Sequence, residues 1–335
     1  MKARTAEARI GIALGILALV LWIHFAPFSI LGTANLALRY ALVATSLILL
    51  TGWVGQISLA QASFVGVAAY VTGLLTRSWQ VPFPLTLPLA AGVAAGVAAL
   101  LGVVALRVRG LYLAVATLIF AWMTQAFLFN QAWFAGEGGS LTARINPLGD
   151  RGTWPYLDFT NRKVFYYISL AVLLTAMLAA ANLRASKTGR AWFALRGSEF
   201  AAASLGVDIT RYKLIAFATS GFMAGAAGSL FMTHQQVATA TSFALPVSLF
   251  FLAVAVVGGL TRLSGAVLGA VVFASLEEVF FRFEQLAGLL DVVSAILLGA
   301  VLLFFPAGLS GIAERAAPPA MRLARRAAGT RAGRA

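Results

Sequence analysis

The 335-residue sequence contains no cysteine, only two histidines and few charged side chains, which make up 11% of the chain. The absence of cysteine excludes disulfides, thiolate metal sites and cysteine nucleophiles. His24 and His234 lie far apart in the sequence, so we expect no metal site. Soluble domains carry about 25% charged residues, whereas this chain is 61% hydrophobic. Lipid must therefore be the solvent for much of the molecule.

The formal net charge is +14. In a soluble protein such a charge favours nucleic-acid binding, but the positions of these charges give another explanation. Lys and Arg accumulate on the cytoplasmic side of membrane proteins. We therefore expect a lipid bilayer, and no nucleic acid, as a partner.

Uncharged runs mark the membrane spans, because a helix needs about 20 apolar residues to cross the hydrocarbon. The runs predict an all-α, polytopic helix bundle of about ten spans. Tyr40–Thr76 is long enough for two spans, divided at Thr51–Gly55, and Leu214–Thr261 for two more, divided near Thr239–Pro246. The other spans are expected at residues 10–27, 78–106, 110–136, 164–183, 263–276 and 292–313. The run that ends at Glu277 is short, so 263–283 is either a span or a re-entrant segment.

The distribution of basic residues predicts the orientation. With the N-terminus inside, 18 Lys and Arg lie inside and 7 outside, with Arg39 in the outer set. This bias predicts that both termini are cytoplasmic (N-in, C-in), with residues 1–313 as the membrane domain and 314–335 as a basic cytoplasmic tail. We interpret residues 1–27 as an uncleaved first helix rather than a signal peptide, because no small-residue cleavage pattern follows.

A polar segment, residues 184–213, stands between two hydrophobic runs and falls in the cytoplasm. Ser198 is a candidate N-cap, and Glu199 in the first turn suits the positive end of a helix. Gly206 can adopt the left-handed conformation that ends a helix, and Asp208 can cap the next one. A helix this short is marginal alone in water, so the rest of the chain or a partner must hold it.

Five ordered motifs resemble those of branched-chain amino-acid ABC transporter permeases, the LivM-like branch. The segment from Ser186 to Phe217, with Glu199-Phe-Ala-Ala at its centre, is similar to the Glu-Ala-Ala loop of that family. Residues 52–70 are similar to the early Gly-Gln-x-Ser segment of the family, and residues 106–118 to its Arg-x-Arg-Gly-x-Tyr turn. Two C-terminal segments of the family are similar to residues 258–270 and 304–309.

The resemblance implies a permease subunit of an ABC importer in the bacterial inner membrane. Such a subunit pairs with a second permease, docks two ATP-binding subunits and receives its solute from an extracytoplasmic binding protein. The ATPase-coupling loop would be residues 184–213, with site residues Arg190, Arg196, Glu199, Ala201, Ala202 and Gly206. The sequence contains no phosphate-binding Gly-x-x-x-x-Gly-Lys-Ser/Thr loop. We therefore expect no catalytic residues and no cofactor in this chain, with ATP hydrolysed by a partner.

Polar residues near the third span are candidates for a substrate pathway: Gln56, Ser58, Gln61 and Ser63. The alternative is that they form hydrogen bonds between helices. The resemblance leaves the solute open among branched-chain amino acids, urea or amides, and aromatic acids. No buried charge dominates a predicted span, which argues against a secondary, proton-coupled transporter.

Small residues at helical spacing predict close helix contacts, because lipid gives helices little hydrophobic drive to associate. The candidate pairs and triplets are Gly92 with Gly96, Gly221 with Gly225 and Gly228, and Gly265 with Gly269. An interface that moves during transport is the alternative interpretation. Glu277, Glu278, Glu284 and Asp291 are expected at a solvated outer rim, with contact to a binding protein as the alternative.

Overall fold

A computed structural model describes residues 28–108, 110–136, 139–143, 159, 161–282 and the single positions 293, 296, 299 and 309. The expected first span, most of the last one and the tail 314–335 lie outside the described residues. The N-in, C-in orientation and the count of ten spans therefore remain predictions.

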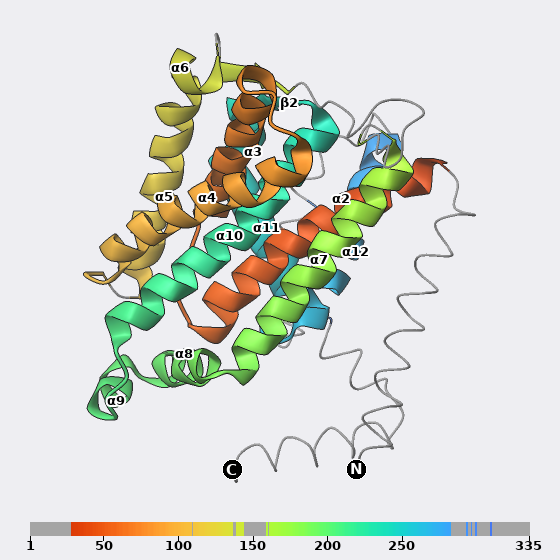
Figure 1. Ribbon diagram of the computed structural model, residues 1–335. Helices are drawn as coiled ribbons and strands as arrows, with labels where there is room; N and C mark the ends of the chain where they lie inside the picture. The colour runs from red at the N-terminus through yellow and green to blue at the C-terminus, as the bar shows by residue number, and fades with distance from the viewer. Residues whose placement is uncertain are drawn as a thin grey trace, which may run out of the picture.

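Long helices lie side by side in one bundle, and two short helices project from one end (Figure 1). In chain order the elements are α2 (Phe28–Leu47), η1 (Ile48–Trp53), α3 (Gln61–Ser78), α4 (Phe83–Ala105), α5 (Leu111–Ala126), η2 (Leu128–Asn130), α6 (Ala132–Ala135), β1 (Ser140–Thr142), α7 (Arg162–Ala185), α8 (Lys187–Gly197), α9 (Glu199–Ser204), α10 (Ile209–Gln235), β2 (Val237–Thr239), η4 (Ala240–Phe243), α11 (Leu245–Gly258) and α12 (Leu263–Arg282). The molecule is thus a helical, multi-pass bundle, as predicted. A two-stranded antiparallel ribbon, with Leu141 opposite Ala238, is the one described departure from an all-α chain.

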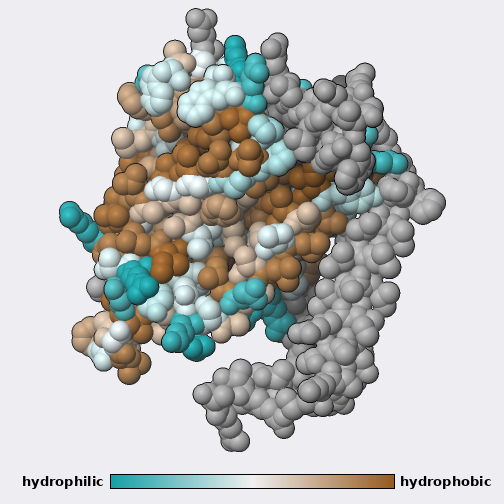
Figure 2. Space-filling view, viewed as in Figure 1, coloured by the Kyte–Doolittle hydropathy of each residue, from teal (hydrophilic) through white to brown (hydrophobic). Residues whose placement is uncertain are grey.

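Six described helices are long and apolar enough to cross a membrane: Ile30–Trp53, Phe83–Ala105, Tyr112–Asn130, Arg162–Ala185, Ile209–Gln235 and Leu263–Phe280. The shorter α11 is also apolar. Figure 2 shows hydrophobic side chains over the middle of one face, with hydrophilic residues gathered mainly toward its ends. That distribution is expected of a surface that meets lipid.

Three charged residues lie inside candidate spans where the sequence did not predict them. Arg39, expected outside a span that starts at Tyr40, lies within Ile30–Trp53 and is only 4% exposed. Glu277 and Glu278, expected at a solvated rim, lie within Leu263–Phe280, because α12 continues to Arg282. Both expectations were wrong because a charge was taken to end a span. Arg39 is buried in the bundle instead, and Glu277 is partly buried and accepts a hydrogen bond from Tyr40 of α2.

α10 is the centre of the bundle and packs against α2, α3 and α4. Glycines on α10 allow the backbones of these helices to approach closely. A Cβ built on Gly221 would lie 2.3 Å from Cβ of Ala98, and one on Gly228 would lie 2.0 Å from the carbonyl oxygen of Val65. The predicted contact face of α10 is therefore confirmed. The close helix contact expected at Gly92 and Gly96 is not found among the described residues. A Cβ built on either glycine would meet no atom of another element within 4 Å.

Candidate coupling site

The polar segment folds as three capped helices, α8, α9 and the start of α10. The hydroxyl of Ser186 accepts a hydrogen bond from the backbone N–H of Thr188 at 3.1 Å and caps α8. Ser198 caps α9 in the same way, and the carboxylate of Asp208 caps α10 through the N–H of Arg211 at 3.0 Å. The predicted caps at Ser198 and Asp208 are thus confirmed.

Gly206 provides the turn between α9 and α10. Its φ is +79°, the left-handed conformation predicted for it. No neighbouring atom lies within 4 Å of a Cβ built there, so only the backbone requires glycine at this position. The turn directs α9 away from the bundle, at the end opposite to the β1–β2 ribbon (Figure 1).

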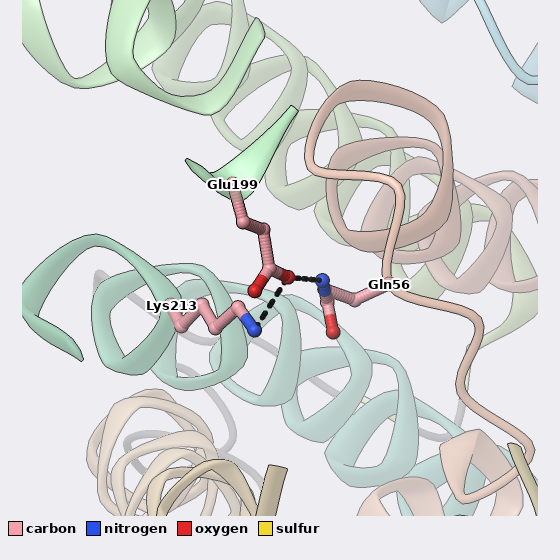
Figure 3. A network of polar contacts seen from close by, with 3 residues as sticks. All are labelled: Gln56, Glu199 and Lys213. Atoms are coloured by element: carbon pink, nitrogen blue, oxygen red, sulfur yellow. Dashed lines mark hydrogen bonds and ion pairs between the residues drawn. The ribbon is translucent and has the colours of Figure 1, made fainter. Parts of the chain in front are cut away.

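A buried ion pair fastens α9 to the bundle. The ammonium group of Lys213, on α10 and only 1% exposed, lies 2.6 Å from Oε1 of Glu199. Nε2 of Gln56 donates a hydrogen bond to the same oxygen at 3.1 Å. Figure 3 shows the Lys213 and Gln56 side chains converging on Glu199 from separate elements. A buried cation requires such a partner, because an unpaired charge is costly to desolvate.

The end of η1 and the segment that follows it form the second half of this site. The guanidinium of Arg196, on α8, donates a hydrogen bond to the carbonyl oxygen of Gly52. A Cβ on Gly52 would lie 1.9 Å from the carbonyl oxygen of Leu260. Gly55 adopts a φ of +79° with the side chain of Arg196 packed against it. Glycine is therefore needed at 52 for space and at 55 for backbone conformation.

Aromatic side chains hold α8 in place. Trp192 is fully buried, and its indole N–H donates to the carbonyl oxygen of Tyr212 at 2.9 Å. The guanidinium of Arg184 lies 5.6 Å from the ring centres of both Trp53 and Phe193. These contacts add cation–π attraction to the polar ones. The loop is consequently attached to α2–η1, α7 and α10.

The outer face of α9 is apolar and exposed. Phe200 on α9 and Leu205 directly after it are each 82% exposed, although this helix projects into the aqueous phase if the bundle spans the membrane. Ala201 is exposed and Ala202 buried beneath it. Exposed apolar side chains on a fastened, projecting helix are typical of a protein-binding surface.

Comparisons with known proteins identify the family of the chain. The family model described as "Branched-chain amino acid transport system / permease component" matches residues 29–306. This chain belongs to that family.

Curated relatives support the assignment. The chain is 30% identical to the high-affinity branched-chain amino acid transport system permease protein LivM of Salmonella typhimurium, over 75% of this chain and 64% of that protein. Identity to LivM of Escherichia coli is also 30%, over 82% and 68%. The chain is 24% identical to the autoinducer 2 import system permease protein LsrC of an Enterobacter species, over 84% and 79%. It therefore spans about two thirds of the length of the LivM proteins. No solved structure matches the chain significantly.

The residues predicted for ATPase coupling differ in their contacts within this fold. Glu199 is ion-paired to Lys213 and Ala202 is buried. Arg196 is exposed but donates a hydrogen bond to Gly52. Arg190, Ala201 and Gly206 are exposed. Lys213 and Trp192 were not predicted as site residues. The position of Lys213 beside an apolar run is nevertheless a signal that its charge is buried and paired with an acidic residue.

The candidate pathway residues are all buried, and their described side-chain partners differ. Gln56 donates a hydrogen bond to Glu199 in the candidate coupling site. Nε2 of Gln61 donates to the hydroxyl of Ser220 at 3.0 Å, and this hydroxyl donates to the carbonyl oxygen of Ser46. Ser58 and Ser63 are 1% and 0% exposed. The contacts of Gln61 connect helices, so the role of these residues in transport stays a prediction.

Proposed function

We propose that the chain is the membrane-spanning permease subunit of an ABC importer that moves branched-chain amino acids, or related small polar solutes, into the cytoplasm. A partner would hydrolyse ATP. The observation that carries the proposal is the α8–α9 loop, a structured element with an apolar outer face and a buried ion pair beneath it. Family membership and the names of the LivM relatives support the class of solute.

The loop suits the transmission of force from an ATP-binding subunit. A subunit that grips Phe200 and Leu205 would move α9. Glu199 connects α9 to α10 through Lys213 and to the segment that precedes α3 through Gln56. α3 and α10 are packed together in the bundle core. A displacement of α9 would therefore reach α10 directly and α3 through the short segment that precedes it.

The complete assembly follows from this proposal. The chain would cross the bacterial inner membrane about ten times with both termini inside. A second permease would complete the pathway, two ATP-binding subunits would dock on the loops, and an extracytoplasmic binding protein would deliver the solute. The matching of LsrC supports a wider range of solutes within the same fold. Urea, amides and aromatic acids therefore remain alternatives, and a secondary transporter is the alternative mechanism.

Removing the apolar face of α9 tests the proposal. We expect the double variant Phe200→Ser, Leu205→Ser to insert normally but to lose co-purification with the ATP-binding subunit, and ATP-dependent leucine uptake to fall at least tenfold. Trp133→Ser is the matched control, because Trp133 is 71% exposed on α6 at the opposite end of the bundle. Normal docking and uptake in the double variant would contradict the proposed role of α9.

A further inference from the structure

A cavity of about 470 Å³ lies among α2, α10, α11, α12 and the η4 segment. It is lined at one end by Gln235, Thr241 and Ser242, which lie where α10 ends and hence far from the coupling site. Arg39, which lies beside Phe231 of α10, lines it from within the span Ile30–Trp53. The 14 residues between Arg39 and Trp53 correspond to about 20 Å of helix. The cavity therefore reaches from the end opposite α9 toward the middle of the bundle.

Arg39 is a buried cation with an incomplete set of partners. Its Nε donates to the carbonyl oxygen of Asn35 at 3.4 Å, and its guanidinium lies 5.7 Å from the ring centre of Phe231. Its Nη1 has no hydrogen-bond acceptor among the described residues. An arginine within a membrane span is expensive and marks a functional site by default.

An acidic group lines the same cavity. Oε2 of Glu277 accepts a hydrogen bond from the hydroxyl of Tyr40 at 2.5 Å, so α2 and α12 are joined there. Within the described part of the chain, no ion pair joins Glu277 to Arg39. The cavity thus presents one positive and one negative side chain that do not neutralise each other by direct contact.

Aromatic rings form much of the remaining wall. Phe231 and Phe243 meet edge to face with ring centres 5.1 Å apart, and Phe250 and Phe251 lie beside Tyr40 at 5.3 and 5.9 Å. All four phenylalanines line the cavity. Its volume falls in the range of about 300–1,000 Å³ that is usual for small-molecule sites, which combine apolar walls with a few polar groups.

We propose that this cavity binds an α-amino acid with an apolar side chain, with the carboxylate at Arg39, the ammonium group at Glu277 and the side chain against the phenylalanine rings. The inference rests on the proposed import function and adds a substrate site within this subunit. An arginine fork can make two parallel hydrogen bonds to a carboxylate. Both charges of the zwitterion lose water in the bundle, and that loss is compensated only by charged or hydrogen-bonding partners.

The absence of native cysteine provides a direct test. Ala244 lines the cavity, so Ala244→Cys puts a single thiol of this subunit in its wall. Ala132→Cys is the matched control, exposed on α6 and not part of the lining. The rate of maleimide labelling is measured in membranes that carry the assembled transporter, without ATP, over a range of leucine concentrations. We expect leucine to slow the labelling at position 244 at least fivefold and to leave position 132 unchanged.

Charge-deleted probes and variants identify the contacts. Neither 4-methylpentanoate nor 3-methylbutylamine, which each lack one charge of leucine, should protect the thiol at position 244 at the concentration at which leucine does. Arg39→Gln and Glu277→Gln, each introduced beside Ala244→Cys, should raise the leucine concentration for half-protection at least tenfold. Should either variant fail to assemble, the analogues decide the question in the otherwise unchanged protein.

The outcomes are distinct. The proposed site would be overturned if the two analogues protected the thiol as well as leucine does, or if leucine gave no protection in a transporter that imports leucine. It would also be overturned if the leucine concentration for half-protection were unchanged in the variants. In that case Arg39, Tyr40 and Glu277 serve only to join α2 to α12, and the variants lower thermal stability alone. A transporter that imports no branched-chain amino acid would instead contradict the proposed function.

Discussion

At the residue scale, the pair formed by Lys213 and Glu199 is asymmetric. Lys213 is 1% exposed, whereas Glu199 is 17% exposed and also accepts a hydrogen bond from Gln56. Removing the carboxylate of Glu199, which leaves the more deeply buried Lys213 without its partner, should therefore lower the stability more than removing Lys213. Removal of one member of a buried pair costs about 3–5 kcal/mol, while replacement of both is often close to neutral.

We accordingly expect Glu199→Gln to lower the thermal stability of the purified subunit more than Lys213→Met does. The double variant should recover most of that stability, because no uncompensated buried cation remains. Its ATP-dependent uptake should nevertheless stay low, since α9 would no longer be held by an ion pair. Thermal unfolding and uptake measured on the four proteins of this cycle check both statements. Additive losses of stability would show that the two residues do not interact.

At the scale of elements, local features were predictable and long-range ones were not. The caps at Ser198 and Asp208 and the left-handed turn at Gly206 depend on residues a few positions away, so the sequence contains the required information. The hydrogen bond from Tyr40 to Glu277 joins residues 237 positions apart. Charged residues were taken to end the predicted spans. The predicted span therefore began at Tyr40, after Arg39, whereas α2 begins at Phe28. The two α-helices that share a buried polar contact cannot be identified from their own sequences.

The turn at Gly206 leads to a prediction about α9 as a unit. Gly206→Val should cost about 1 kcal/mol or more, because a β-branched residue is strained at positive φ. Gly206→Asn is the control, since asparagine tolerates this conformation. Open space around the position means that side-chain volume has no effect. We expect the valine variant to insert but to lose uptake and ATPase co-purification, with the asparagine variant close to unchanged. Equal activity of both variants would show that the direction of α9 is unimportant.

At the scale of the whole molecule, the helices position the proposed coupling and substrate sites at different depths. Arg39 and Trp53 lie on one continuous helical stretch, α2–η1, whose far end contacts the coupling site through Trp53 and Gly52. α10 likewise begins at Asp208 beside α9 and ends at Gln235 in the wall of the cavity. Two helices thus connect both sites directly, so a shift of either helix along its axis would change both together.

This arrangement requires that α9 and α6 lie on opposite sides of the membrane. The excess of Lys and Arg on the α9 side also predicts this, even without Arg39, which lies inside a span. Single cysteines at Ser198, before α9, and at Ala132, on α6, test it in the otherwise cysteine-free chain. A membrane-impermeant maleimide applied to intact cells, after permeabilisation of the outer membrane, should label Ala132→Cys at once. Ser198→Cys should react only after the inner membrane is opened. Labelling of Ser198→Cys from outside would place the α8–α9 loop beyond the reach of a cytoplasmic ATPase, whereas protection of both positions would show that α6 does not face the outside. The expected result fixes the direction of the whole bundle, because α7 and α10 both meet the loop at the same end.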